Sequence, residues 1–327
     1  MTNLTRLTVS HRGLSAPPAW VYGASTRINN CYELGCELLY QNQIYIPPAC
    51  DEFQLSRKTT AFKKNKFNFF KLKIQKFSDE KVFYDARNFF NGNIAHLTQY
   101  HLTSLAILCM DFSISEENVG IIFSKKDGAL GYELFSKLGF NCLITDQNIN
   151  APIFQSPIND DNFFHYMRKA KNFANGIFPQ IPADGKYFIP RKGTRKLINE
   201  LDVGNFLKLH GYEKLYLEDL SISEQMDKWL TAKSVVAIHG AGLGWMPFSL
   251  ASKFSLVELF PSGFVVNPFR KSHAVMYPGS LWRGIRGVLD WRVVKKIDSS
   301  HNFKKFAFDD FQVDLKSLAL ALKDIED

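Results

Sequence analysis

The chain has 327 residues, a length that usually exceeds what one hydrophobic core organises, so we expect two domains. Hydrophobic residues make up 46% and charged residues 22%, which excludes a largely disordered chain. No apolar run approaches the roughly 20 residues that cross a bilayer, and the first residues lack the apolar core of a secretion signal. The net charge of +8 suits anionic ligands or an anionic membrane surface. We therefore expect a cytoplasmic protein, compatible with peripheral contact at the inner face of a membrane.

The sequence offers little support for metal or disulfide chemistry. The five cysteines form no C-x-x-C pair and have no metal-site spacing with histidine, so we interpret them as free thiols: Cys31, Cys36, Cys50, Cys109 and Cys142. No Asp-x-Asp motif occurs, and the acidic pair Asp160-Asp161 is typical of a solvated turn. We expect no metal site and no cofactor besides the substrate.

Residues 1 to about 80 predict a small antiparallel β region, with strand-like alternation over Phe69–Phe77. The same region carries a basic stretch interleaved with phenylalanines. Its cations are Arg57, Lys58, Lys63, Lys64, Lys66, Lys71, Lys73 and Lys76. A solvated strand face is the favoured interpretation, with a lipid-diphosphate or membrane-surface patch and a single-stranded nucleic-acid site as alternatives. Because no nucleic-acid motif accompanies the stretch, we expect no nucleic-acid partner.

Residues from about 81 to 160 have the pattern of a parallel sheet. Ile94–Met110 predicts a helix, Val119–Phe123 a strand, Gly131–Leu138 a helix and Cys142–Thr145 a second strand. A cluster of proline and glycine, Phe178–Gly185, then predicts an interdomain linker.

A second alternation of strands and helices is expected after the linker. Its expected strands are Tyr187–Pro190, Leu215–Leu217, Val235–Ile238 and Leu256–Phe260, and its expected helices are Leu197–His210, Ser223–Ala232 and Gly242–Leu250. An amphipathic helix is expected over Phe308–Ile325. We predict two Rossmann-like domains facing a cleft: an acceptor domain over residues 1–180 and a nucleotide-sugar domain over 181–307. The last helix, 308–327, is expected to pack back on the first domain.

The chemistry concentrates at His239-Gly-Ala-Gly-Leu243, where the expected strand Val235–Ile238 runs into the start of a helix. Glycines allow close approach of the main chain, and the N–H groups at a helix start favour an anion such as a diphosphate. Arg191 and Arg195 follow the preceding strand and are expected at the same edge, where guanidinium groups pair with phosphate oxygens. Glu258, near the carboxyl end of the next strand, is expected to accept hydrogen bonds from ribose hydroxyls; an ion pair at the sheet edge is the alternative.

These segments resemble glycosyltransferase family 61. The resemblance rests on Tyr187-Phe-Ile-Pro-Arg191, Arg195-Lys-Leu-Ile-Asn-Glu200, Gly211-Tyr212, Leu220-Ser-Ile-Ser-Glu-Gln225, Ala232, His239-Gly-Ala-Gly-Leu243 and Val257-Glu-Leu-Phe-Pro261. It implies a GT-B fold and inverting, metal-independent transfer of a hexose or pentose from a nucleotide-sugar donor, expected to be UDP-linked. It further implies a glycan or lipid-linked glycan acceptor, and the missing secretion signal favours a bacterial capsule or lipopolysaccharide enzyme.

An inverting transfer needs a general base. Asn91-Gly-Asn-Ile-Ala-His96 resembles the family's Asn-x-x-His segment, although Thr98-Gln99-Tyr100 stands where an acidic residue is usual. We predict His96 as the base and His239 as a second catalytic residue, with His101 and Glu200 as alternative bases. The donor site is predicted to consist of Arg191, Arg195, His239, Gly240, Ala241, Gly242, Leu243 and Glu258.

Two other interpretations stay open. A nucleotide-binding epimerase or dehydrogenase would need a Gly-x-Gly-x-x-Gly opening its first strand–helix unit, and neither half shows one. A non-catalytic carbohydrate- or nucleotide-binding protein that retains the fold is the second. Asn199-Glu200 and Glu224-Gln225 can equally be structural links between helices and sheet.

Overall fold

The computed structural model describes residues 81–87, 91–146, 148–154, 158, 163–261, 268–287 and 308–326, and the main chain of eight short strands before them. The chain forms two compact units, residues 1–45 with 180–327 (unit 1) and residues 46–179 (unit 2). Residues 1–45 were predicted to belong to the first domain, but they group with unit 1. There β4 (Ala19–Val21) lies beside β17 (Trp282–Arg286).

Three short antiparallel pairs account for the expected β region at the N-terminus. They are β1 (Thr5–Leu7) with β4, β2 (Ser10–His11) with β3 (Leu14–Ser15), and β5 (Arg27–Ile28) with β6 (Cys31–Tyr32). The prediction was wrong for residues 55–76, since β7 (Leu55–Thr60) and β8 (Ile74–Lys76) join the sheet of unit 2. The side chains of the basic stretch lie outside the described residues, so its role stays a prediction.

Unit 2 is built on a six-stranded sheet in which the strand order is β11-β10-β9-β12-β7, with β8 beside β12. Its further strands are β9 (Val82–Asp85), β10 (Val119–Phe123), β11 (Asn141–Ile144) and β12 (Asn148–Phe154). All neighbours are parallel except β12 and β7. The predicted strand–helix–strand unit is thus confirmed.

The helices of unit 2 also follow the sequence pattern. The helix predicted from Ile94 is continuous as α1 (Ile94–His96), the π-helical segment η3 (Leu97–Leu102) and α2 (Thr103–Asp111), and its predicted apolar side is buried. The others are η4 (Glu116–Asn118, a 3-10 turn), α3 (Ala129–Lys137) and α4 (Phe163–Ile177).

Unit 1 contains a five-stranded, fully parallel sheet in the order β14-β13-β15-β16-β17. The strands are β13 (Gly185–Ile189), β14 (Glu213–Lys214), β15 (Ala232–Ile238), β16 (Ser255–Phe260) and β17. After β13 the chain adds β14 on one side of that strand. It then adds β15, β16 and β17 in turn on the opposite side of β13. The strand order therefore reverses between β13 and β15, and ligands of doubly wound sheets bind outside the carboxyl ends of strands at such a point.

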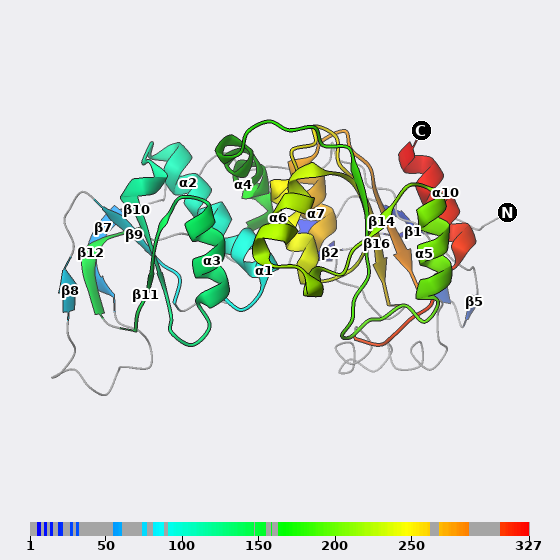
Figure 1. The fold of residues 1–327 in the computed structure, drawn as a ribbon, viewed down its shortest axis with the longest axis horizontal. Coiled ribbons are helices and arrows are strands. Elements are labelled where there is room, and N and C mark those ends of the chain that lie inside the picture. Colours follow the sequence, from blue (N-terminus) through cyan, green and yellow to red (C-terminus); the bar gives the residue numbers. More distant parts are fainter. Residues whose placement is uncertain are drawn as a thin grey trace. The chain divides into compact units, whose positions relative to one another are not determined.

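Helices cover both faces of this sheet (Figure 1). α5 (Glu200–Leu209) and α10 (Leu315–Glu326) share one apolar core with the strands, while α6 (Ile222–Thr231), η6 (Ala241–Phe248) and α7 (Pro268–Met276) lie on the other side. The expectation that the last helix packs on the N-terminal domain is corrected, because Leu318, Ala321 and Leu322 are buried in the core of unit 1. The helix also begins later than predicted, and Phe311 before it pairs as a bridge with Leu197.

Three local predictions differ from the structure. The expected helix after His239 is the 3-10 helix η6, which contains Pro247. The strand expected at Leu215–Leu217 lies earlier, as β14 over Glu213–Lys214, and Leu217 already begins the 3-10 turn η5 (Leu217–Asp219). The helix expected at Ser223–Ala232 is α6, which begins one residue earlier because Ser221 and Glu224 form a capping box. Within the described ranges, no helix is long and apolar enough to cross a membrane. The α/β class with parallel sheets is confirmed.

Candidate functional site

Two arginines converge at the point where the strand order of unit 1 reverses. Arg191 follows β13, and its Nη1 donates a hydrogen bond to the main-chain oxygen of His239 over 3.1 Å. Nη1 of Arg195 donates to the same oxygen over 2.9 Å. The structure thus brings together the two predicted phosphate-binding arginines and the first residue after β15.

Arg195 adopts a backbone conformation that L-residues rarely take, with φ at 63°. Such strain costs on the order of 1 to 3 kcal/mol and persists only where the surroundings impose it. Here the main-chain N–H of Arg195 donates to the oxygen of Phe308, and its guanidinium lies 4.7 Å from the centre of the Phe308 ring. The segment before α10 therefore holds this arginine toward His239.

His239 is fixed through its ring as well as through its main chain. Its Nδ1 lies 2.5 Å from Oε1 of Glu258, and Oε2 of Glu258 accepts a hydrogen bond from Nε1 of Trp282 over 3.0 Å. Glu258 and Trp282 are fully buried. Both oxygens of Glu258 are thus used inside the protein, and this geometry favours holding His239 over the predicted contact with ribose.

Gly240 makes room for Arg191. A β-carbon at Gly240 would lie 2.3 Å from Nη1 of Arg191, so any larger residue displaces the guanidinium. The 3-10 helix that follows has its first main-chain bond from Leu243 to the oxygen of Gly240, so the N–H groups of Ala241 and Gly242 precede the bonded turn. Leu243 itself is buried and anchors the loop.

The two arginines form a concentrated, partly desolvated positive charge. Burial lowers the pKa of Arg191, and burial together with the neighbouring Arg191 lowers the pKa of Arg195 to about 10. Each guanidinium still carries its charge at neutral pH. Because a bound anion relieves both the desolvation and the mutual repulsion, this edge is suited to a phosphate group.

The polar residues predicted near the site hydrogen-bond mainly to the main chain of neighbouring segments. Nε2 of Gln225 donates to the oxygens of Leu217 and Leu220 over 2.9 and 3.0 Å, and its Oε1 accepts from Nε1 of Trp245 over 2.8 Å. Asn199 exchanges two hydrogen bonds with the main chain of Val313. Glu224 belongs to the capping box. The structural interpretation of Asn199, Glu224 and Gln225 is therefore the one the contacts favour.

The predicted bases lie elsewhere. His96 is half-buried in unit 2, at the start of the helix that Asn93 caps by accepting bonds from Ala95 and His96. This cap gives a structural reason for the Asn-x-x-His spacing, and the catalytic role of His96 stays a prediction. His101 is fully buried, with Nδ1 3.0 Å from the hydroxyl of Tyr84, which is typical of a core histidine.

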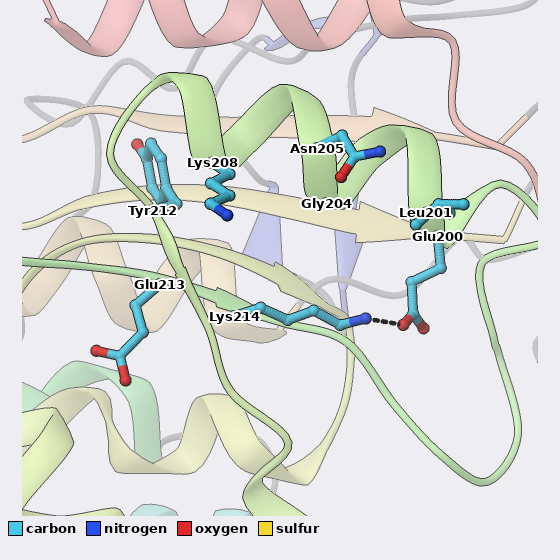
Figure 2. A pocket seen from close by; sticks show the side chains of 8 residues that line it. All are labelled: Glu200, Leu201, Gly204, Asn205, Lys208, Tyr212, Glu213 and Lys214. Carbon is cyan, nitrogen blue, oxygen red and sulfur yellow. Dashed lines mark hydrogen bonds and ion pairs between the residues drawn. The ribbon is translucent and has the colours of Figure 1, made fainter.

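Glu200, the third candidate base, borders a pocket of about 330 Å³ between α5 and the edge strand β14 (Figure 2). Its carboxylate is bonded to Lys214 and Tyr216. The pocket is lined by Glu200, Leu201, Gly204, Asn205, Lys208, Tyr212, Glu213 and Lys214, so it is separate from the arginine pair. In the part of the chain that the structure describes, no group of three His, Cys, Asp or Glu side chains is placed to hold a metal ion.

Sequence reasoning missed Trp282 and Phe269. Trp282 bonds to Glu258, and the ring of Phe269 lies 5.4 Å from that of His239. The available signal was the alternation Trp282-x-Gly284-x-Arg286, which places three residues on one face of a strand. A β-carbon at Gly284 would lie 2.4 Å from the Trp282 ring, so this glycine lets the indole lie across the sheet toward Glu258.

Comparison with known proteins gives one family match. Residues 147–252, from the start of β12 to the loop after η6, match the family model described as Glycosyltransferase 61. The search of curated proteins gives no match. Among solved structures, a crystal structure of Escherichia coli diaminopropionate ammonia lyase in apo form aligns at 12% identity over 72% of this chain, with a TM-score of 0.18. That alignment covers 64% of the lyase chain, and at this score it carries no information on fold or function.

Proposed function

We propose that this chain, which belongs to glycosyltransferase family 61 through residues 147–252, is an enzyme. It transfers one sugar from a nucleoside-diphosphate donor to a hydroxyl group. The proposed acceptor is a surface glycan of capsule or lipopolysaccharide type, or its lipid-linked precursor. A UDP-linked hexose or pentose, the two-domain GT-B arrangement and inversion without a metal belong to this proposal and rest on the family resemblance.

The observation that carries the proposal is the convergence of Arg191 and Arg195 on one main-chain oxygen at the reversal of strand order. When the bond between the sugar C1 and the diphosphate breaks, negative charge grows on the departing phosphate oxygens. Preorganised positive charge in a desolvated site stabilises that change more than the ground state. We expect the N–H groups of Ala241 and Gly242, at the start of η6, to add donors beside the arginines.

His239 is proposed to contact the leaving diphosphate. Glu258 holds Nδ1 of the ring and so fixes the imidazole at the carboxyl end of β15, beside the arginine pair. A carboxylate at Nδ1 fixes the orientation of an imidazole. The acceptor hydroxyl must lose its proton as its oxygen bonds to C1, and His96 is kept as the proposed base for that proton.

The test is a scan of the purified protein against common nucleotide sugars, measuring donor hydrolysis and binding of UDP. Replacing Arg191 by alanine is expected to weaken UDP binding by roughly 10- to 100-fold, because a hydrogen bond to a charged group contributes about 1.5 to 3 kcal/mol. Lys192→Ala is the matched control, since the neighbouring Lys192 is bonded to Asp219 on the surface. The absence of millimolar binding for every donor, or equal loss in both variants, would rule out the proposal in favour of a non-catalytic protein.

A further inference from the structure

The 3-10 turn η5 brings an acidic side chain to the sheet edge that carries the arginine pair. The N–H of Leu215 continues the pairing of β14 with β13 by donating to the oxygen of Phe188 over 2.8 Å. This register places Leu217, the first residue of η5, level with Arg191. The register of β15 on β13 places His239 level with Arg191 from the other side. The turn η5, the arginine pair and the loop after β15 therefore lie in one row across the sheet.

Glu218 is the second residue of η5, and its carboxylate is held beside the arginine pair. Its Oε1 accepts a hydrogen bond from the main-chain N–H of Lys192 over 3.2 Å, one residue beyond Arg191. The carboxylate is also near enough to the Arg191 guanidinium to raise the pKa of that group, against the larger effect of burial. Glu218 is exposed, and within the residues that the structure describes its Oε2 has no hydrogen-bond partner. One oxygen thus fixes the carboxylate, and the other is available to a ligand.

The turn η5 is fastened to the start of η6. Nε2 of Gln225 donates to the oxygens of Leu217 and Leu220, which flank the turn, and Oε1 of the same amide accepts from Nε1 of Trp245 in η6. The two segments also pack directly, because a β-carbon at Gly242 would lie 2.7 Å from Cδ1 of Leu217. The main chain of η5 is therefore fixed relative to the proposed diphosphate site.

A carboxylate at this place suits the sugar of a nucleoside. Ribose carries two neighbouring hydroxyl groups, and a carboxylate accepts hydrogen bonds from both. In dinucleotide-binding sheets of the doubly wound kind, an acidic residue downstream of the phosphate-binding turn binds the ribose. Glu218 has this relation to Arg191, since it follows β14, the strand next to β13. Glu258, which the sequence suggested for this role, uses both of its oxygens inside the protein.

We propose that Glu218 binds the ribose hydroxyls of the donor, so that the nucleoside lies against η5 on the β14 side of the arginine pair. This inference rests on the proposed function and adds two properties to it. The donor crosses the sheet edge from η5 toward His239, with its diphosphate at Arg191 and Arg195. The site also selects ribonucleotide donors over deoxyribonucleotide donors, because a deoxyribose offers the carboxylate one hydroxyl fewer.

The experiment compares wild type with Glu218→Ala and Glu218→Gln, which are expected to fold because Glu218 is exposed. Asp219→Asn is the matched control, because Asp219 is the next carboxylate of η5 and is paired with the exposed side chain of Lys192. Calorimetric titrations use UDP, 2′-deoxy-UDP and 3′-deoxy-UDP. The quantity compared is the ratio of UDP affinity to deoxy-UDP affinity within each variant. This ratio cancels any change in diphosphate binding that follows from losing a negative charge near Arg191.

The expected result is that wild type binds UDP about tenfold or more tightly than either deoxy analogue, since a hydrogen bond to a charged group is lost with each hydroxyl. Glu218→Ala brings the ratio close to one. Glu218→Gln keeps part of the preference, because its amide oxygen still accepts a hydrogen bond. Asp219→Asn keeps the wild-type ratio.

Three outcomes would overturn the role of Glu218 while UDP still binds. In the first, wild type does not distinguish UDP from its deoxy analogues. In the second, Glu218→Ala weakens all three ligands equally and keeps the ratio, which assigns the carboxylate to the nucleobase or to the support of Arg191. In the third, Asp219→Asn lowers the ratio as much as Glu218→Ala does, which shows an effect of η5 as a whole. Failure of the proposed function looks different, because neither UDP nor a deoxy analogue then binds to wild type, and the role of Glu218 falls with it.

Discussion

The two units place an arginine at the same position of similar sheets and give it different partners. In unit 2 the strand order reverses between β9 and β12, and Arg87 follows β9. Nε and Nη2 of Arg87 donate to the two oxygens of Asp85 over 2.9 and 2.7 Å. In unit 1 the corresponding arginines, Arg191 and Arg195, both donate to the uncharged main-chain oxygen of His239.

This difference separates a structural arginine from a ligand-binding one. A bidentate carboxylate neutralises Arg87 and uses its N–H edge, so the reversal point of unit 2 presents little net charge. The main-chain oxygen of His239, which orients Arg191 and Arg195, carries no formal charge, unlike the carboxylate of Asp85. Position at a sheet edge alone therefore does not identify an anion site; the charge of the partner does.

The largest effect is expected when the ion pair between Arg87 and Asp85 is broken. Arg87→Met leaves the charge of Asp85 in a site where the Arg87 side chain is fully buried, and we expect a loss of about 3 to 5 kcal/mol in the free energy of unfolding. Urea denaturation measures the loss, and Asp85→Asn combined with Arg87→Met should recover part of it. UDP affinity should stay unchanged. A fall in UDP affinity matching that of Arg191→Ala would remove the distinction between the two edges.

A second effect concerns His273, a histidine of unit 1 that lies outside the proposed donor site. His273 is fully buried, its Nε2 lies 2.7 Å from the oxygen of Phe254, and burial lowers its pKa to about 4. The unfolded chain, with a pKa near 6.5, binds the proton first, so the stability that neutral His273 maintains is lost as pH falls from 6.5 to 4. The expected loss is about 3 kcal/mol. Unfolding of wild type and His273→Gln across this range measures it; parallel curves would contradict a structural, neutral His273.

The third effect tests how His239 is held. Glu258→Gln removes the charge beside Nδ1 but keeps the shape of the side chain, and we expect the transfer rate to fall roughly 100-fold. UDP affinity should fall less than about threefold, because the arginine pair is intact. Trp282→Phe, which removes one hydrogen bond to Glu258, should give a smaller change in the same direction. A large loss of UDP affinity with an unchanged rate would restore Glu258 as a donor contact.

The smallest expected effect concerns the space beside Arg191. Gly240→Ala places a methyl group against the mobile end of the guanidinium, so UDP affinity should fall about tenfold while the free energy of unfolding changes by less than about 1 kcal/mol. Gly204→Ala is the control, because a β-carbon there meets its nearest neighbour at 3.9 Å. Equal UDP affinity in both variants would show that the position of Arg191 does not matter for the donor.

The sequence predicted the parts of the site that follow strand ends. β15 and β16 are nearly continuous apolar runs, so their carboxyl ends, and with them His239 and Glu258, were located from the pattern. β13 was found for the same reason, whereas β14 was expected at Leu215–Leu217 and β17 was not predicted. Glu258 was placed correctly, but its partners depend on β17 lying beside β16, which no local pattern states.

Other features depend on contacts between distant segments. The backbone of Arg195 takes its unusual φ because Phe308, more than a hundred residues later, holds it. The 3-10 form of η6 follows from glycines and Pro247 within an apolar run that otherwise predicts an α-helix. The last helix packs in unit 1 because its apolar face completes the core under β16 and β17.

The central claim is that Arg191 and Arg195 form a diphosphate site, and the ratio of UDP to uridine affinity tests it most directly. Both ligands share the nucleoside, so the ratio isolates the diphosphate. Calorimetric titration of wild type should give UDP at least about 100-fold tighter than uridine, and the Arg191→Gln/Arg195→Gln double variant should bring the ratio close to one while uridine affinity is unchanged. A double variant that binds UDP over uridine as strongly as wild type does would contradict the account.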